Sequence, residues 1–152
     1  NAYDFRKMAS SKTPLIHFHF LQPISLSRRR ELKAFIESIF RKERVVADQV
    51  NYIFCSDEYL LGINRQFLQH DFFTDIITFN LAGKRQAVNA EIYISVDRVK
   101  ENARELKVSA RQELLRVMFH GVLHLCGYKD KNKGQTREMR SKEDFYLKKF
   151  LG

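Results

Sequence analysis

The segment 109–127 constrains the fold of this chain more than any other part of its sequence. Ser109 followed by Gln112 matches a capping box, which marks the start of a helix, and Gly127 marks its end. The helix between them is apolar almost all round, at Leu114, Leu115, Val117, Met118, Val122 and Leu125. Because a helix that is hydrophobic on every side must be covered on every side, this segment predicts a central buried helix around which the rest of the chain packs.

The remainder of the chain alternates between strand-like and helix-like patterns. Short runs of β-branched and aromatic residues predict strands over 15–21, 45–55, 75–81 and 88–95. Helical spacing of apolar residues predicts helices over 25–44, 58–68, 96–106 and 136–150, the first capped by Ser25 or Ser27 and the second by Ser56 or Asp57. The pattern indicates an α+β fold, in which a small mixed four-stranded sheet carries packed helices and the last two strands form a hairpin.

The length of 152 residues suits one domain, and a hydrophobic content of 44% is sufficient to fill its core. We therefore expect a single domain over 13–152, with residues 1–12 either disordered or an artificial addition. The longest apolar runs are too short to span a bilayer, no signal peptide is recognisable, and Cys55 and Cys126 lie far apart. These features predict a cytoplasmic location.

The formal net charge of +9 indicates affinity for polyanions, of which nucleic acid is the first candidate. Charge is weak support on its own, because helix surfaces are ordinarily charged. The run Arg28-Arg29-Arg30 and the basic last helix are explained as well by solvated helix faces as by contacts with phosphate.

His120 and His124 lie four residues apart on the predicted central helix and therefore share one of its faces. Two imidazoles so placed can hold one metal ion, and Asp130 can supply a third ligand because the chain turns back near Gly127. Three protein ligands leave a position open for water, as in catalytic zinc sites, so no catalytic group beyond the metal-bound water is required. The alternative is that both histidines are ordinary core residues.

The segment 120–130, HGVLHLCGYKD, resembles the signature H-G-x-L-H-L-x-G-Y-D-H of the YbeY endoribonuclease family. This family binds zinc through the three histidines of the motif, which implies the same role for His120 and His124. The third position is Asp130 here, and an aspartate can ligate zinc but also favours harder divalent metals such as manganese. The resemblance therefore implies one Zn²⁺ per chain, with a harder divalent metal as the alternative.

The run 64–79 resembles a second motif of that family, N-x-x-[YF]-R-x-x-D-x-x-T-[DN]-V-L-S-F. The arginine of this motif, which the family uses for RNA cleavage, falls on Leu68, and Arg65 on the same predicted helix is the candidate to replace it. The family's G-D-I strand corresponds to 90–92. The residues that we expect to contact RNA are Arg65, Thr74, Asp75 and Glu91.

The resemblance implies a metal-dependent endoribonuclease with a metzincin-like central helix, specific for single strands and acting in 16S rRNA 3′-end maturation and ribosome quality control. The implied partners are single-stranded RNA, ribosomal RNA and the small ribosomal subunit, with no membrane or DNA partner. A non-catalytic RNA-binding ribosome-assembly factor is one alternative, favoured by Leu68 and Asp130. A zinc metalloprotease is another, but Gly121 stands where the H-E-x-x-H motif has its general base.

Overall fold

The computed structural model describes residues 15–152, so the expectation for residues 1–12 lies outside the part of the chain that it describes. The expectation of a single domain over 13–152 stays a prediction. The strands and helices of the described residues occur in the predicted order. They are β1 (Ile16–Phe20), α2 (Arg29–Lys42), β2 (Ala47–Cys55), α3 (Asp57–Leu68), β3 (Ile76–Asn80), β4 (Val88–Ser95), α4 (Val96–Leu106), α5 (Ala110–Leu125) and α6 (Lys133–Leu151).

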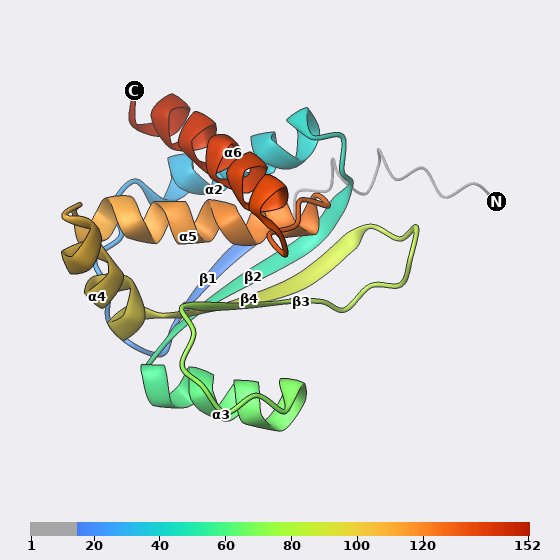
Figure 1. Cartoon of the computed structure of the whole chain (residues 1–152). Coiled ribbons are helices and arrows are strands. Elements are labelled where there is room, and N and C mark those ends of the chain that lie inside the picture. Colours follow the sequence, from blue (N-terminus) through green and yellow to red (C-terminus); the bar gives the residue numbers. More distant parts are fainter. Residues whose placement is uncertain (1–14) are drawn as a thin grey trace.

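The strands form one mixed sheet of four strands in the order β1-β2-β4-β3 (Figure 1). Strand β1 pairs with β2 and β2 with β4 in parallel, whereas β3 pairs with β4 in the antiparallel sense. The predicted hairpin of the last two strands is thereby confirmed, and so is the α+β class with a small mixed sheet. Strand β3 occupies one edge of the sheet, next to the end of α5 that carries the two histidines.

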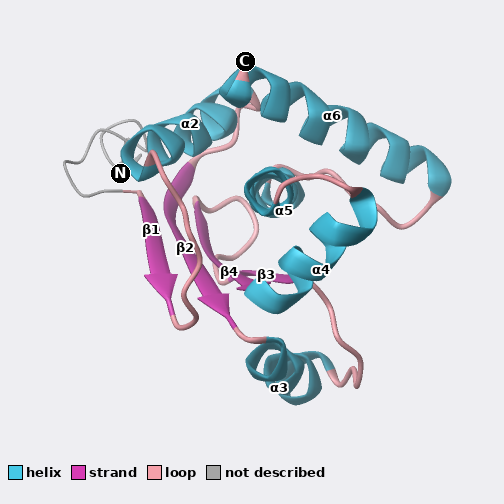
Figure 2. Cartoon of the chain, turned by 90° about the vertical axis from the view of Figure 1, so that its left-hand side faces the viewer, coloured by secondary structure: helices cyan, strands magenta, loops and turns pink. Residues whose placement is uncertain are grey.

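Helix α5 lies across one face of the sheet with α2, α4 and α6 around it, and α3 lies apart at the opposite face (Figures 1 and 2). Alternation along the strands explains this arrangement, since successive side chains point to opposite faces. Ile92 of β4 belongs to the main core with the α5 residue Met118, whereas its neighbour Tyr93 packs against a small second core that contains Leu60 of α3. The predicted central buried helix is therefore confirmed.

Gly121 allows α5 to approach the sheet closely at the level of the two histidines. A Cβ atom at this position would lie 3.0 Å from the Cδ1 atom of Ile76 and 3.1 Å from two side-chain atoms of Ile92. Side chains on the sheet would have to move to admit even one methyl group. The glycine thus sets the distance between the histidine helix and strands β3 and β4.

Substituting Gly121 by valine is expected to lower the free energy of unfolding by roughly 1–3 kcal/mol, because the added atoms overpack the helix–sheet contact. The matched control is Gly62→Val, since a Cβ at Gly62 of α3 would meet nothing within 4 Å. That control should change stability by less than about 0.5 kcal/mol. Denaturant unfolding of both variants measures the difference, and equal stability of the two would show that α5 is not tightly packed at this point.

The predicted cap of α2 is wrong. The N-cap is Arg28 in the left-handed conformation at φ 55°, and no side chain caps the helix. The hydroxyl of Ser27, one of the two predicted caps, instead accepts a hydrogen bond from Arg111 at the start of α5 at 2.6 Å. By contrast, Ser56 and Ser109 accept hydrogen bonds from Tyr59 and Gln112 in the expected manner.

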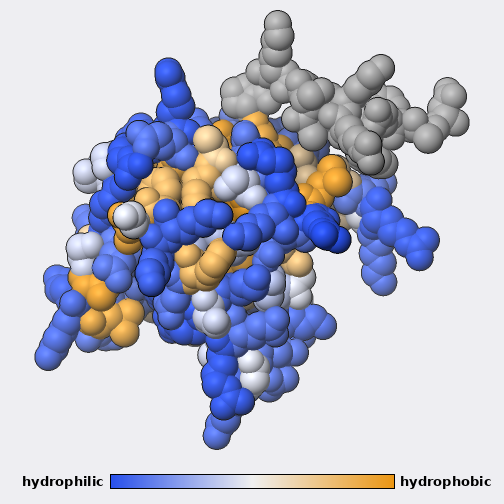
Figure 3. Space-filling model, turned by 90° about the horizontal axis from the view of Figure 1, so that it is seen from above, coloured by the Kyte–Doolittle hydropathy of each residue, from blue (hydrophilic) through white to orange (hydrophobic). Residues whose placement is uncertain are grey.

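The face of the molecule over α6 and α2 is mainly hydrophilic, with small hydrophobic areas between the charged side chains (Figure 3). Some of its basic side chains make cation–π contacts: Nζ of Lys42 lies 4.3 Å from the ring centre of Phe145. Among the described residues, none of the helices is both long and apolar enough to cross a membrane.

Candidate metal centre

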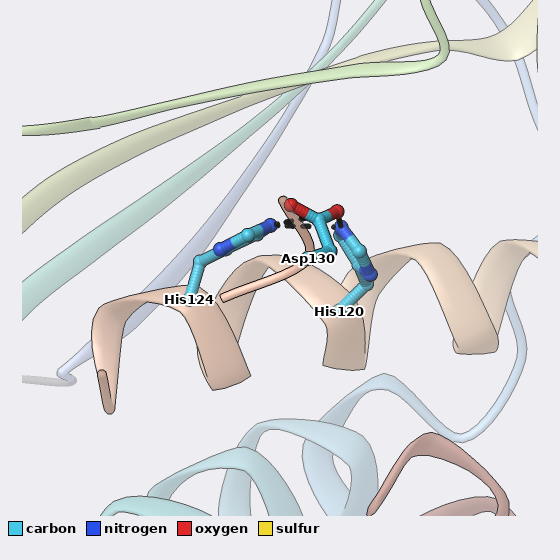
Figure 4. Close-up of side chains that lie close together, drawn as sticks. All are labelled: His120, His124 and Asp130. Carbon is cyan, nitrogen blue, oxygen red and sulfur yellow. Dashed lines mark hydrogen bonds and ion pairs between the residues drawn. The ribbon is translucent and has the colours of Figure 1, made fainter. Parts of the chain in front are cut away.

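The structure brings His120, His124 and Asp130 together at one point (Figure 4). The Nε2 atoms of the two histidines lie 3.0 Å apart, and Oδ2 of Asp130 lies 3.4 Å from each of them. Their side chains are 18%, 30% and 40% exposed, in that order. The three atoms thus form a compact triangle that is partly open to solvent on the aspartate side.

The turn that returns Asp130 to the helix is built by a left-handed glycine. Gly127 has φ +100°, a conformation that residues with a Cβ rarely adopt. Its N–H donates to the carbonyl of His124, and the N–H of Tyr128 donates to the carbonyl of Leu123, each at 3.0 Å. This pair of bonds is the Schellman motif, which ends the helix and reverses the chain. The sequence placed the helix end at Gly127 for the same reason.

The neighbours of the two imidazoles determine which nitrogen carries the proton. Nδ1 of His120 lies 2.7 Å from Oε2 of Glu143, and Nδ1 of His124 lies 3.0 Å from the carbonyl oxygen of Tyr128. Both oxygens are acceptors only, so we assign the donated proton to Nδ1 in each ring. Each Nε2 then presents a lone pair, which is the tautomer that a metal ligand requires.

The site therefore directs acceptor atoms at one another with no proton between them. Two Nε2 lone pairs and the carboxylate of Asp130 converge on the same volume, an arrangement that is repulsive unless a cation lies there. Ligands bound at about 2.0–2.1 Å around a tetrahedral ion lie about 3.3–3.4 Å apart. The separations of 3.0, 3.4 and 3.4 Å observed here fit that spacing. The three residues thus suit one small divalent cation.

Behind His120 lies a chain of buried charged groups that links α5 to α6. Arg116 donates to Glu143 at 2.9 Å and also pairs with Glu113, and both carboxylate residues are almost fully buried. Burial alone would raise the pKa of Glu143, but the hydrogen bonds from His120 and Arg116 outweigh it and lower this pKa below its ordinary value. Glu143 therefore stays an ionised acceptor that holds the ring of His120 in place.

The candidate metal centre opens into a cavity of about 550 Å³ between the end of α5, β3 and the loop after α3. Of the four residues that the sequence predicted to contact RNA, Thr74 and Asp75 line this cavity and the other two do not. Arg65 is ion-paired with Asp71, and Glu91 accepts a hydrogen bond from the hydroxyl of Tyr93. Their assignment as RNA contacts stays a prediction.

Sequence reasoning missed two aromatic residues of this cavity. His70 and Phe72 line it together with the three candidate ligands. In the sequence they fall between the helix predicted over 58–68 and the strand predicted over 75–81, and the sequence assigns them no functional role. Leu68, at the position of the family's arginine, lines it as well. The signal that could have identified the aromatic pair is the presence of large rings in a polar loop directly before β3, where no core is within reach.

Comparison with known proteins identifies the family of this chain. The model of the family described as endoribonuclease YbeY matches residues 22–151. This chain belongs to the endoribonuclease YbeY family. The predicted membership is thereby confirmed, and the predicted class of enzyme, an endoribonuclease, is the class after which this family is named.

Several relatives align with most of the length of this chain. It is 48% identical to an endoribonuclease YbeY of Cytophaga hutchinsonii, over 80% of this chain and 85% of the relative. It is 43% identical to that of Flavobacterium psychrophilum, over 90% and 96% of the two chains. The solution structure of TM1509 from Thermotoga maritima superposes with a TM-score of 0.64 at 34% identity, over 89% of each chain. These alignments thus cover 80–90% of this chain.

Proposed function

We propose that this protein is a metal-dependent endoribonuclease that cleaves single-stranded RNA, with His120, His124 and Asp130 holding the metal. The observation that carries the proposal is the convergence of two imidazole nitrogens and one carboxylate oxygen at the edge of a cavity. The metal, when bound, supplies Lewis acidity that lowers the pKa of water and offsets charge on a phosphodiester. We favour zinc, with manganese as the alternative because Asp130 replaces the third histidine of the family motif.

The residues of the chain itself would orient the reaction. Glu143 and the carbonyl of Tyr128 fix the two imidazoles, and the more exposed Asp130 leaves the solvent side of the site open to a phosphodiester. The cavity is large enough for a nucleotide and lies beside this open side. The net charge of +9 supports a polyanionic substrate. No nucleophilic side chain is needed for this chemistry.

Within the proposal, the natural substrate is ribosomal RNA, acted on at the 3′ end of 16S rRNA and in ribosome quality control, and the partner is the small ribosomal subunit. Such a substrate places the protein in the cytoplasm. The names of the relatives support an activity on RNA. The resemblance in the histidine motif supports the ribosomal assignment.

A second candidate function is a non-catalytic ribosome-assembly factor that binds RNA with the same surface. The observation that favours it is the cavity lining, because Leu68 takes the place of the family's arginine and the described lining contains no arginine or lysine. The protease alternative loses support from the structure. A glutamate at Gly121 would meet Ile76 and Ile92 of the sheet, so this position is not free to carry a general base.

Metal removal distinguishes the two main candidates. Cleavage of a labelled single-stranded RNA is expected to fall to the background rate after dialysis against a chelator. It should return when zinc or manganese is added back, and magnesium should restore less because it prefers octahedral oxygen ligands. Gel analysis of the products measures cleavage. RNA binding without cleavage under every metal would contradict the nuclease and support the assembly factor, and a casein assay tests for a protease.

A further inference from the structure

Exposed hydrophobic side chains gather on the segment 67–73, at the end of α3 and in the loop that follows. Phe67, Leu68, Phe72 and Phe73 are 59%, 40%, 55% and 49% exposed. A cluster of large apolar side chains held in water usually marks a binding surface. Two of its rings already have partners, because Phe67 packs edge-on to Phe79 and Phe73 lies under the guanidinium of Arg98.

Phe72 differs from Phe67 and Phe73 because it lines the cavity of the candidate metal centre. Its ring stacks on the imidazole of His70, with centroids 5.0 Å apart and planes inclined by 22°. Both residues are exposed, and both line the same cavity as His120, His124 and Asp130. A flat aromatic surface therefore adjoins the point where the phosphodiester would be cleaved.

The loop that carries this pair is fixed by a buried side chain. Asn64 is 1% exposed, and its side-chain amide donates to the backbone carbonyl of Phe72 at 2.9 Å. The backbone carbonyl of Asn64 accepts from the backbone N–H of His70 at 3.1 Å. The ion pair of Arg65 with Asp71 adds a further contact between the helix and the loop. The two rings are thus held in position before any ligand arrives, which lowers the entropic cost of binding.

We propose that His70 and Phe72 form a platform on which an unpaired base of the RNA substrate stacks next to the metal centre. This inference rests on the proposed function and names the feature of the substrate that the site selects. An exposed ring surface suits any base, since every base has a π face, but it requires a base that is not paired. The platform thus gives a structural reason for preference for single strands and little preference for sequence.

The test uses the full-length protein with the metal chelated, so that the RNA is bound and not cut. The probe is a short single-stranded RNA that contains 2-aminopurine, whose fluorescence is quenched when it stacks. Phe72→Ala is expected to weaken binding about 5- to 100-fold and to reduce the quench, whereas Phe72→Tyr should keep both. Binding of the same sequence as a duplex should be the same for Phe72→Ala and the native protein. Fluorescence anisotropy measures the dissociation constants.

Phe145→Ala is the matched control, because it removes an exposed ring on α6 that does not line the cavity. This variant should bind single-stranded RNA like the native protein. If Phe72→Ala also retained the native dissociation constant and quench, the platform would be overturned, even where the metal-loaded native protein cleaves RNA. Quenching that depends on Phe72, together with no cleavage by the metal-loaded native protein, would support the platform and overturn the nuclease. Absence of RNA binding by the native protein in the chelated state would overturn the platform, and absence of cleavage by the metal-loaded native protein would overturn the nuclease.

Discussion

Replacing His124 by alanine is expected to abolish metal binding and RNA cleavage together. The imidazole supplies one of the three candidate ligand atoms, and its loss leaves only His120 and Asp130, which are too few to hold a small divalent cation tightly. Loss of a hydrogen-bond partner of a ligand already costs about 10- to 100-fold in affinity, so loss of the ligand itself should cost more than about 100-fold. Elemental analysis of the purified protein and a cleavage assay on single-stranded RNA measure the two effects.

The matched control for this variant is His17→Ala. His17 lies on β1, far along the chain and outside the group of candidate ligands, so this change removes an imidazole without altering the site. It should leave the metal content at about one ion per chain and the cleavage rate unchanged. Equal metal content in the native protein and His124→Ala would refute the assignment of the site, and equal cleavage by the two would point to a contaminating nuclease.

Replacing Glu143 by glutamine is expected to have the second largest effect, although this residue does not touch the metal position. The carboxylate holds the ring of His120 with its Nε2 lone pair directed at the site. Glutamine has the same shape but lacks the charge, and its amide group would face Arg116 or His120, both of which donate. Metal affinity should fall about 10- to 100-fold. The free energy of unfolding should also fall, by roughly 1–3 kcal/mol, because a buried hydrogen-bonded charge is lost.

Competition with a chromogenic chelator measures the affinity, at a temperature where each variant is fully folded. Glu138→Gln makes the same chemical change at an exposed position of α6 and serves as the control. If Glu143→Gln were less stable but bound metal as tightly as Glu138→Gln, the residue would only support the fold. A reduced affinity in a fully folded protein shows instead that it positions the ligand.

The first prediction removes a candidate ligand, and the second removes a group that orients one. Together they test how the two imidazoles are held in place. His124 is held by the carbonyl of Tyr128, four residues later and next to the helix end that the sequence marks at Gly127. By contrast, His120 is held by Glu143 of α6, a helix that follows later in the chain. The chain Glu113–Arg116–Glu143–His120 therefore couples the metal position to the docking of α6 on α5. Metal binding should accordingly stabilise the contact between these helices.

Apart from the cap of α2, the sequence alone was sufficient for the main features that depend on neighbours along the chain. The spacing of His120 and His124 follows from the helical repeat, and the return of Asp130 follows from the left-handed turn that Gly127 permits. The order of strands and helices followed in the same way from local periodicity, and the caps at Ser56 and Ser109 from local hydrogen bonding. These features can be predicted from the sequence because the interacting residues lie within a few positions of each other.

Only the tertiary structure decided the features that depend on partners far away in the chain. Ser27 does not cap α2 because Arg111 binds its hydroxyl, and His120 is oriented by a carboxylate 23 residues later. The pairing of His70 with Phe72 in the metal cavity likewise depends on how Asn64 and strand β3 place the loop. Many residues of the right chemical type are present in the chain, and tertiary packing determines which of them come into contact. The sequence pattern alone does not show these long-range contacts. For that reason the three candidate metal ligands could be selected from the sequence, whereas the groups that orient them and the surface beside them could not.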